Sequence, residues 1–421
     1  MKKLLVITLA VLLVGAFTVP AMAVDHEFGG FWNTRFFSAS NFSGDDSESQ
    51  DGRYVDTRTR LYYTAVLSDE LKLVNKFEMD ADWGDDERGD IGADGQNFEI
   101  KHSYADFNLG DWNVKLGTQG KAFARGFVFD SDFSGAIVRL VTDDMVIPFV
   151  WMKVFEGGYG EDANDLDLDY YGVDPSFNMG DMKLNPFILL ATSAGGGEVN
   201  ADNEWTGYGN GVGWDALSVY YLGVNVDYNA DMFSAWLTGI YSAGSVDVAD
   251  DYQAAYGTDS FDVAAYLFAF GGAVNLDAVS VHGQLFYATG DDDDLSDDEA
   301  SNFFVPAGQS YYWAEIMGFG SFDDQVSNGS PGDAISNVMA FNVGVDLPMD
   351  KLTLSVDLWN ASLLEEDANG DTALGTEIDV AASYQLLDDL KMKVVAAYLA
   401  AGDATGDENP TELGAVLSLS F

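Results

Sequence analysis

Residues 411–421, the last eleven of the chain, read TELGAVLSLSF. Side chains of an extended strand alternate between two faces, so this segment sorts its residues by a period of two. The apolar face would carry Leu413, Ala415, Leu417, Leu419 and Phe421. The opposite face is mostly small or polar. A strand of this length with one apolar face can cross a bilayer when it is tilted, and it determines the fold if the rest of the chain repeats it.

The same pattern recurs along the chain. Eighteen segments read as strands, with sixteen as the alternative count because segment 136–142 is short. Segment 98–109 has ambiguous facing, because its apolar residues change parity between Ile100 and Phe107. The predicted strands are 28–38, 53–67, 71–83, 98–109, 112–120, 136–142, 146–155, 168–179, 183–193, 217–228, 232–247, 261–275, 279–289, 337–347, 352–364, 376–386, 390–401 and 411–421.

The connections between these strands alternate in length. Short turns carry Asp, Gly or Asn, as at 110–111 and 180–181, whereas long acidic, Gly-rich connections occur at 84–97 and 194–216. Membrane barrels have short turns at one end and long loops at the other. The sequence therefore predicts an all-β fold: a transmembrane antiparallel β-barrel of 18 strands with apolar residues on lipid. Eighteen strands enclose a lumen too wide for side chains to fill, so we expect a polar, aqueous interior.

The N-terminal region indicates export. Lys2 and Lys3 precede an apolar run at 4–19 and a small-residue cleavage site at 21–23. We interpret residues 1–23 as a signal peptide and residues 24–421 as one barrel domain, exported through the periplasm to the outer membrane. The chain has no cysteine, so no disulfide stabilises it.

The composition is strongly acidic. Removing the two leader lysines leaves 17 of the 19 basic residues against 70 acidic ones. Such a charge argues against nucleic acid as a partner. The chain is nevertheless 47% hydrophobic, which excludes disorder as the explanation of the charge.

Residues 112–142 form the segment with the strongest functional signal: WNVKLGTQGKAFARGFVFDSDFSGAIVRLVT. The third long connection lies here and is unusually apolar. An exterior loop is normally polar, so we expect this one to fold into the lumen. Its charged residues, which would face the pore, are Lys121, Arg125, Asp130 and Asp132.

The opposite side of the pore is predicted from basic residues on the wall. Arg58 and Arg60 lie on one strand face, and each would cost about 2–4 kcal/mol near the middle of the lipid. They should therefore face the lumen, as should Lys76, Lys115 and Arg139 by the same argument. Basic wall residues opposite acidic loop residues would make a transverse field that biases which ions pass. The alternative is that these charges are simply solvated.

The chain resembles the trimeric general porins. More closely, it is similar to the homotrimeric porin family of sulfate-reducing bacteria, through the LGTQG…ARGFVFDSDFSGA segment and the terminal Phe421. A terminal aromatic residue resembles the one that barrel-insertion machinery reads. The resemblance implies a third loop, carrying Asp130 and Asp132, that constricts the pore. It also implies a homotrimer packed along the barrel walls, among outer-membrane lipid and lipopolysaccharide.

Catalysis finds little support. The three histidines, His26, His102 and His282, lack metal-binding spacing, and no nucleophile or dinucleotide motif occurs. We expect no enzyme activity, cofactor or metal site.

The expected function is passive diffusion of ions and small hydrophilic solutes. A sugar-type selective channel and a secreted acidic β-protein that binds ligands or cations are the alternatives. One connection, 291–336, contains FFVPAGQSYYWAEIMGFG and is too apolar for a bare exterior loop. It either enters the barrel or hides a hairpin.

Overall fold

The computed structural model describes residues 24–421 with several gaps, and the predicted signal peptide lies outside the described residues. Within the described part of the chain, no helix combines the length and apolar character needed to cross a membrane. The segments not described are 45–51, 86–88, 92–96, 143–144, 157–166, 194–213, 249–252, 254–256, 292–297 and 323–324.

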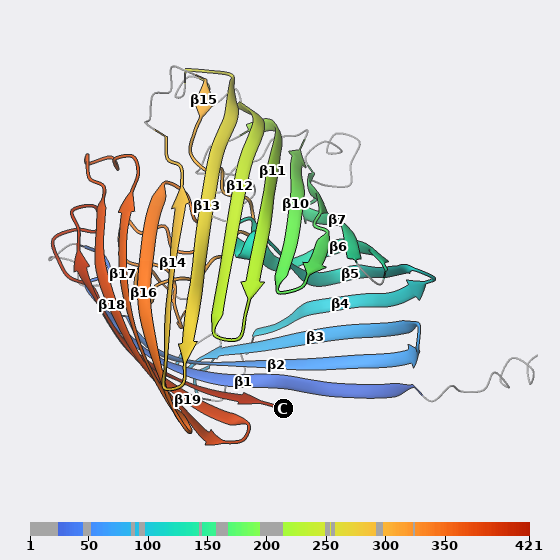
Figure 1. Ribbon diagram of the computed structural model, residues 1–421, viewed down its shortest axis with the longest axis horizontal. Helices are drawn as coiled ribbons and strands as arrows, with labels where there is room; N and C mark the ends of the chain where they lie inside the picture. Colours follow the sequence, from blue (N-terminus) through green and yellow to red (C-terminus); the bar gives the residue numbers. More distant parts are fainter. Residues whose placement is uncertain are drawn as a thin grey trace, which may run out of the picture.

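The strands form one closed antiparallel barrel (Figure 1). The first strand, β1 (Asp25–Ser40), pairs with the last, β20 (Thr411–Ser420), so the sheet has no free edge. The strands between them are β2 (Arg53–Ser68), β3 (Leu71–Asp82), β4 (Asn97–Leu109), β5 (Trp112–Phe123), β6 (Phe129–Val141), β7 (Met145–Phe155), β8 (Leu168–Val173), β9 (Ser176–Met179), β10 (Met182–Ser193), β11 (Trp214–Asn229), β12 (Phe233–Val248), β13 (Ser260–Leu276), β14 (Val279–Ala288), β15 (Glu299–Ala300), β16 (Val338–Met349), β17 (Leu352–Leu363), β18 (Ala373–Leu387) and β19 (Leu390–Ala401).

These twenty strands form a wall of eighteen. β8 and β9 both pair with β7 and β10, so they are one wall strand interrupted at Asp174 and Pro175. β15 has two residues, lies parallel to β13, and stands outside the antiparallel ladder. The predicted count of eighteen strands is therefore confirmed.

Short turns join the strands at one end of the barrel. Gly110 and Gly180 each begin a two-residue turn with φ of 63°, a conformation that costs glycine no steric energy. These tight hairpins fix the register, so each strand keeps its apolar side chains on one face.

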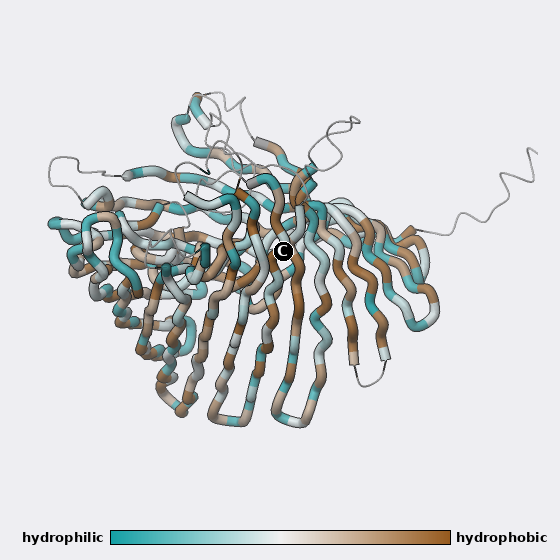
Figure 2. Tube along the Cα trace, turned by 90° about the horizontal axis from the view of Figure 1, so that it is seen from above, coloured by the Kyte–Doolittle hydropathy of each residue, from teal (hydrophilic) through white to brown (hydrophobic). Residues whose placement is uncertain are grey.

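The outer face is apolar, as predicted. On β16, Phe341, Val343 and Leu347 point away from the barrel and are all more than 40% exposed. The outward residues of β20 include Leu413, which is 59% exposed. Hydrophobic and hydrophilic residues alternate along the wall strands (Figure 2). Such a surface is stable in hydrocarbon and costly in water.

The third connection lies inside the barrel, but it is a hairpin rather than a long loop. β5 pairs with β4 only up to Ser103 and Thr118, whereas β5 and β6 continue pairing up to Phe123 and Phe129. The turn between them is only 124–128. The predicted strands 112–120 and 136–142 were therefore too short, because this hairpin keeps its hydrogen bonds after it leaves the wall. We call residues 119–133 the inner hairpin.

The connection between β14 and β16 also enters the barrel. Residues 301–322 and 325–337, which we call the inward connection, contact wall strands on different sides of the lumen. Tyr311 Oη donates to Gln284 on β14 at 2.7 Å, and the Phe322 carbonyl accepts from Arg35 on β1 at 2.6 Å. Of the two readings of segment 291–336, entry into the barrel is the one that residues 301–322 and 325–336 follow, and the described residues contain no hidden hairpin.

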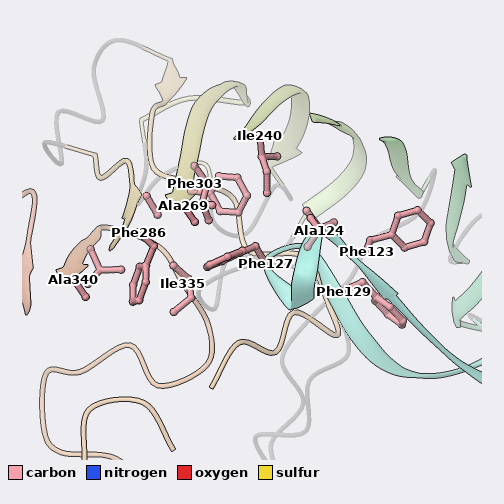
Figure 3. Close-up of a cluster of buried hydrophobic side chains, with 14 of the residues drawn as sticks. Phe123, Ala124, Phe127, Phe129, Ile240, Ala269, Phe286, Phe303, Ile335 and Ala340 are labelled. Atoms are coloured by element: carbon pink, nitrogen blue, oxygen red, sulfur yellow. The ribbon is translucent and has the colours of Figure 1, made fainter. Parts of the chain in front are cut away.

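The two inward segments meet in an apolar core (Figure 3). Phe127 at the tip of the inner hairpin is fully buried and stacks on Tyr311, with ring centroids 3.8 Å apart. Figure 3 shows Phe127 between the hairpin and the side chains of Phe286 and Ile335.

The predicted polar, aqueous interior is wrong for part of the wall. On β10 the inward side chains are Phe187, Leu189 and Ala191, all buried, while Ile188 faces outward. On β13 the inward positions Leu267 and Ala269 are likewise buried. These strands are apolar on both faces because the inward connection covers their inner face and excludes water.

The apolar outer face can be tested by substitution at mid-strand. We expect Val343→Arg to lower the free energy of unfolding by about 2–4 kcal/mol, because the guanidinium would enter hydrocarbon. The matched control is Ser355→Arg on the lumenal face, where Ser355 contacts Asp346 at 2.5 Å and an arginine would meet that carboxylate. Urea unfolding in lipid vesicles measures both, and a loss for Ser355→Arg as large as that for Val343→Arg would contradict the assignment of faces.

Candidate functional site

A charged cavity of about 770 Å³ lies inside the barrel, between the wall formed by β2–β4, the inner hairpin and the inward connection. Its lining comes from segments far apart in the sequence. The lining residues are Arg58, Arg60, Lys76, Lys101, His102, Gly120, Lys121, Ala122, Asp130, Ser131, Asp132, Gly308, Gln309, Ser310, Tyr312 and Asp333.

Arg58 and Arg60 line this cavity and are held by carboxylates on β3. Arg58 lies 2.9 Å from Asp80 and 3.7 Å from Glu78, and Arg60 contacts Glu78 as well. The cross-strand register pairs Arg58 with Asp80 and Arg60 with Glu78, so the contacts follow directly from the sheet. Paired in this way, the guanidinium groups keep fixed positions and present their remaining N–H groups to the lumen.

A β-bulge adds two residues that the sequence analysis did not predict. The register between β3 and β4 shifts between Lys76 and Phe77, and this shift turns Lys101 and His102 to the same side. Lys101 Nζ lies 3.1 Å from Asp132 and His102 Nε2 lies 2.9 Å from it. A bulge inserts one extra residue and re-aims side chains. The change of parity within segment 98–109 was the signal in the sequence.

Two further cations complete the basic side of the cavity. Lys121 on the inner hairpin forms an ion pair with Asp174. Lys76 lies over the ring of Tyr62, with Nζ 5.7 Å from the centroid. The basic side chains therefore come from β2, β3, β4 and the hairpin. Asp130 on the hairpin and Asp333 on the inward connection line the same cavity.

Arg125 lies at the turn of the inner hairpin and spans to the opposite wall. Its φ of 61° puts it in the left-handed region. The guanidinium contacts Asp227 at 2.5 Å and Thr238 at 3.2 Å, and lies 4.9 Å from the ring centroid of Trp236. These contacts with β11 and β12 fix the tip of the hairpin. Arg125 lines a neighbouring cavity of about 360 Å³ that shares Asp130 with the first.

Lys115 and Arg139 lie elsewhere. Neither lines the charged cavity, although both were predicted for the wall side of the constriction. Lys115 Nζ lies 3.9 Å from Asp106 and 5.2 Å from the ring centroid of Tyr104, toward the end of the barrel that carries the short turns. The other predicted residues, on both the loop side and the wall side, gather around the two neighbouring cavities.

Burial changes the protonation of two groups on the inward connection. It raises the pKa of the Asp333 carboxyl above its ordinary value, against hydrogen bonds from Ser310 and the backbone that lower it. Burial also raises the pKa of the Tyr311 phenol, which therefore stays protonated and donates to Gln284. Asp333 thus takes up a proton more readily than an ordinary aspartate. The same holds for Asp130 on the inner hairpin, whose pKa is raised by burial and by the neighbouring Asp132 carboxylate.

A second cavity of about 470 Å³ lies on the other side of the inward connection. Trp236, Trp313 and Trp359 line it, and the rings of Trp313 and Trp359 meet edge to face at 5.3 Å. His282 lies between two carboxylates, 2.8 Å from Asp357 and 3.2 Å from Asp346. The lumen therefore contains a basic cavity and an aromatic, acidic one.

The comparisons with known proteins give a likeness of fold. The outer membrane protein OprD from Pseudomonas aeruginosa superposes with a TM-score of 0.56 at 11% identity, covering 96% of this chain and 95% of that one. OccK1 (OpdK) from the same organism gives 0.60 at 12%, covering 94% and 98%. OccAB4 from Acinetobacter baumannii gives 0.59 at 9%, covering 94% and 98%. No family model matches the chain, and no curated protein matches it.

At these identities the comparison establishes the closed barrel as that of outer-membrane proteins. The fold and the apolar outer face agree with the predicted location in the outer membrane.

Proposed function

We propose that this protein is an outer-membrane channel through which small hydrophilic solutes and ions diffuse passively, with a preference for solutes that carry a carboxylate. One observation carries the proposal: the cavity of about 770 Å³ in which five arginine and lysine side chains surround the space left by the two inward segments. These are Arg58, Arg60, Lys76, Lys101 and Lys121.

The channel would select solutes by their size and by the electric field across the lumen. The inner hairpin and the inward connection fill much of the lumen, so only small solutes fit. Cations on the wall side oppose Asp130 and Asp333, and a transverse field of this kind orients polar solutes and disfavours apolar ones. Arg58 and Arg60 can shift hydrogen bonds from their partner carboxylates to the carboxylate of a passing solute. These hydrogen bonds lower the free-energy cost of removing water from that solute. The process needs neither energy input nor catalysis.

A similar solved structure supports the choice of solute. OpdK from Pseudomonas aeruginosa was solved with vanillate, an aromatic carboxylate, and its chain shares 11% identity with this one. For this chain, the support for carboxylates comes from the charge of the cavity.

We also propose that the channel is a homotrimer surrounded by outer-membrane lipid and lipopolysaccharide. The support is the resemblance of the LGTQG…ARGFVFDSDFSGA segment to the homotrimeric porins. Conductance that closes in steps of three would agree with it.

A sugar-selective channel is the second candidate. Three tryptophans line the second cavity, and aromatic faces beside carboxylates are groups on which sugar rings stack and hydrogen-bond. Current block separates the candidates. We expect vanillate to reduce the single-channel ion current saturably, and an uncharged disaccharide to reduce it much less at equal concentration. The reverse order would favour the sugar channel.

The basic wall is expected to set ion preference. Replacing both arginines (Arg58→Ala, Arg60→Ala) removes two positive charges. Asp80 then loses its arginine, and Glu78 keeps only Lys101, at 3.8 Å. The reversal potential in a salt gradient should then move toward that of a cation-selective channel, and saturable block by vanillate should weaken. Planar-bilayer recording measures both.

Lys351→Ala is the control for loss of a positive charge outside the cavity, because Lys351 is exposed in a short turn. It should leave the reversal potential close to the original. An equal shift in the control and the double variant would mean that the cavity does not set selectivity.

Acidification should change ion preference through Asp333. Because its folded-state pKa is raised, Asp333 loses its negative charge as pH falls while ordinary aspartates are still ionised. Selectivity should therefore move toward anions on acidification. In Asp333→Asn the charge is absent at every pH, so the shift should be smaller. An identical pH dependence in both proteins would assign it to other carboxyls.

A further inference from the structure

Glu377 on β18 joins the inward connection to the wall. Its side chain is completely buried, and it accepts hydrogen bonds from two successive backbone N–H groups. Ile316 N–H donates to Oε1 at 2.7 Å and Met317 N–H donates to Oε2 at 3.0 Å. These two hydrogen bonds tie residues 316 and 317 of the inward connection to β18.

Two more carboxyls lie beside it. The side chain of Asp379, two residues along β18, is within hydrogen-bonding contact of Glu377. Glu412 on β20 occupies the same row of the sheet, because Asp379 pairs with Ala397 and Ala397 pairs with Glu412. Asp379 is 7% exposed and Glu412 is 4% exposed. Asp379 Oδ1 and Glu412 Oε1 accept no hydrogen bond from the described residues.

This group contains more acid than its cations can neutralise. Glu315 on the inward connection approaches from the lumen, and Lys393 on β19 lies 3.3 Å from it. Lys393 Nζ is also bound to Ser321 Oγ at 2.5 Å. One ammonium therefore faces four carboxyls, of which three are buried. An unpaired buried carboxylate costs several kcal/mol, so such groups retain protons.

The other charged groups packed around this row have their own partners. On β17, Asp357 pairs with His282 at 2.8 Å, and on β1, Arg35 pairs with Asp56 at 2.6 Å. A hydrogen bond between the Glu377 and Asp379 carboxyls requires a proton on one of them. Because both oxygens of Glu377 already accept N–H groups, Asp379 must supply the hydrogen that bonds the two carboxyls.

We propose that Glu377, Asp379 and Glu412 form a proton-holding latch that holds the inward connection against the wall and thereby sets the width of the passage. Glu377 is a positioning residue, since it acts through residues 314–322 rather than on a solute. Loss of the protons on Asp379 and Glu412 would place additional negative charges beside Glu377 and Glu315. Their repulsion would release this part of the connection, so the latch holds at neutral pH and opens as pH rises.

The inference rests on the proposed function only where conductance is the readout, so the first test uses chemical labelling. The chain has no cysteine, and a single introduced thiol therefore gives an unambiguous signal. Ala314→Cys places the thiol at a fully buried position beside the latch. Asp350→Cys, in the exposed turn before β17, reports how thiol reactivity itself changes with pH. The measured quantity is the ratio of their maleimide labelling rates in lipid vesicles.

The ratio should rise with pH, by up to about tenfold per unit for each proton that is lost. Asp379→Asn, combined with the reporter, keeps a permanent N–H donor to Glu377 and should hold the ratio low at every pH. Glu377→Gln loses one acceptor and sets an amide N–H₂ against a backbone donor, so the ratio should be high at every pH. Single-channel conductance of each variant should follow the same order.

A ratio that does not change with pH in the parent reporter, or an unaltered pH dependence in Asp379→Asn, would overturn the latch. Ser327→Cys, which is 1% exposed on the same connection, replaces the reporter if Ala314→Cys does not fold. Labelling needs no ion flow. A protein that shows the labelling pattern but forms no channels would therefore contradict the proposed function and support the latch.

Discussion

The pairing of β1 with β20 is the contact on which the structure depends. Hydrocarbon offers no partner for backbone N–H and C=O groups, so a sheet can stand in it only when the first and last strands meet. The terminal residue takes part: Gly30 and Phe421 exchange two backbone hydrogen bonds, of 3.0 and 3.2 Å. β1 also carries Arg35 and Phe37, and both contact Phe322. The strand that closes the wall thus also supports the segment that fills it.

The wall could be predicted from the sequence because each strand repeats one simple rule. A period of two, interrupted by turn residues, predicted all eighteen wall strands to within a few residues. The exception is the part of the inner hairpin nearest its turn, which was not predicted as strand. Segment 168–179 was predicted as one strand, and the structure interrupts it at Pro175, which has no N–H to donate. The entry of the third connection into the lumen was predicted from its apolar residues, Phe123, Phe127 and Phe129 among them.

The interior could not be predicted in the same way. Periodicity places a residue on a face but does not say what covers that face or which cavity it lines. Lys115 and Arg139 were therefore grouped with Arg58, although neither lines the charged cavity. Lys101 was missed because a bulge breaks the period that the prediction used. The runs at 183–193 and 261–275 are apolar on both faces, and their contact with the segments inside the barrel explains this.

The buried inner face of β10 to β14 has a consequence for assembly. An empty barrel of this sequence would expose Leu189, Tyr221, Leu267 and Phe286 to water inside the lumen. The closed wall is therefore not a stable intermediate that later receives its contents. The inward connection and the wall therefore stabilise each other, because each covers apolar surface that the other would otherwise expose to water.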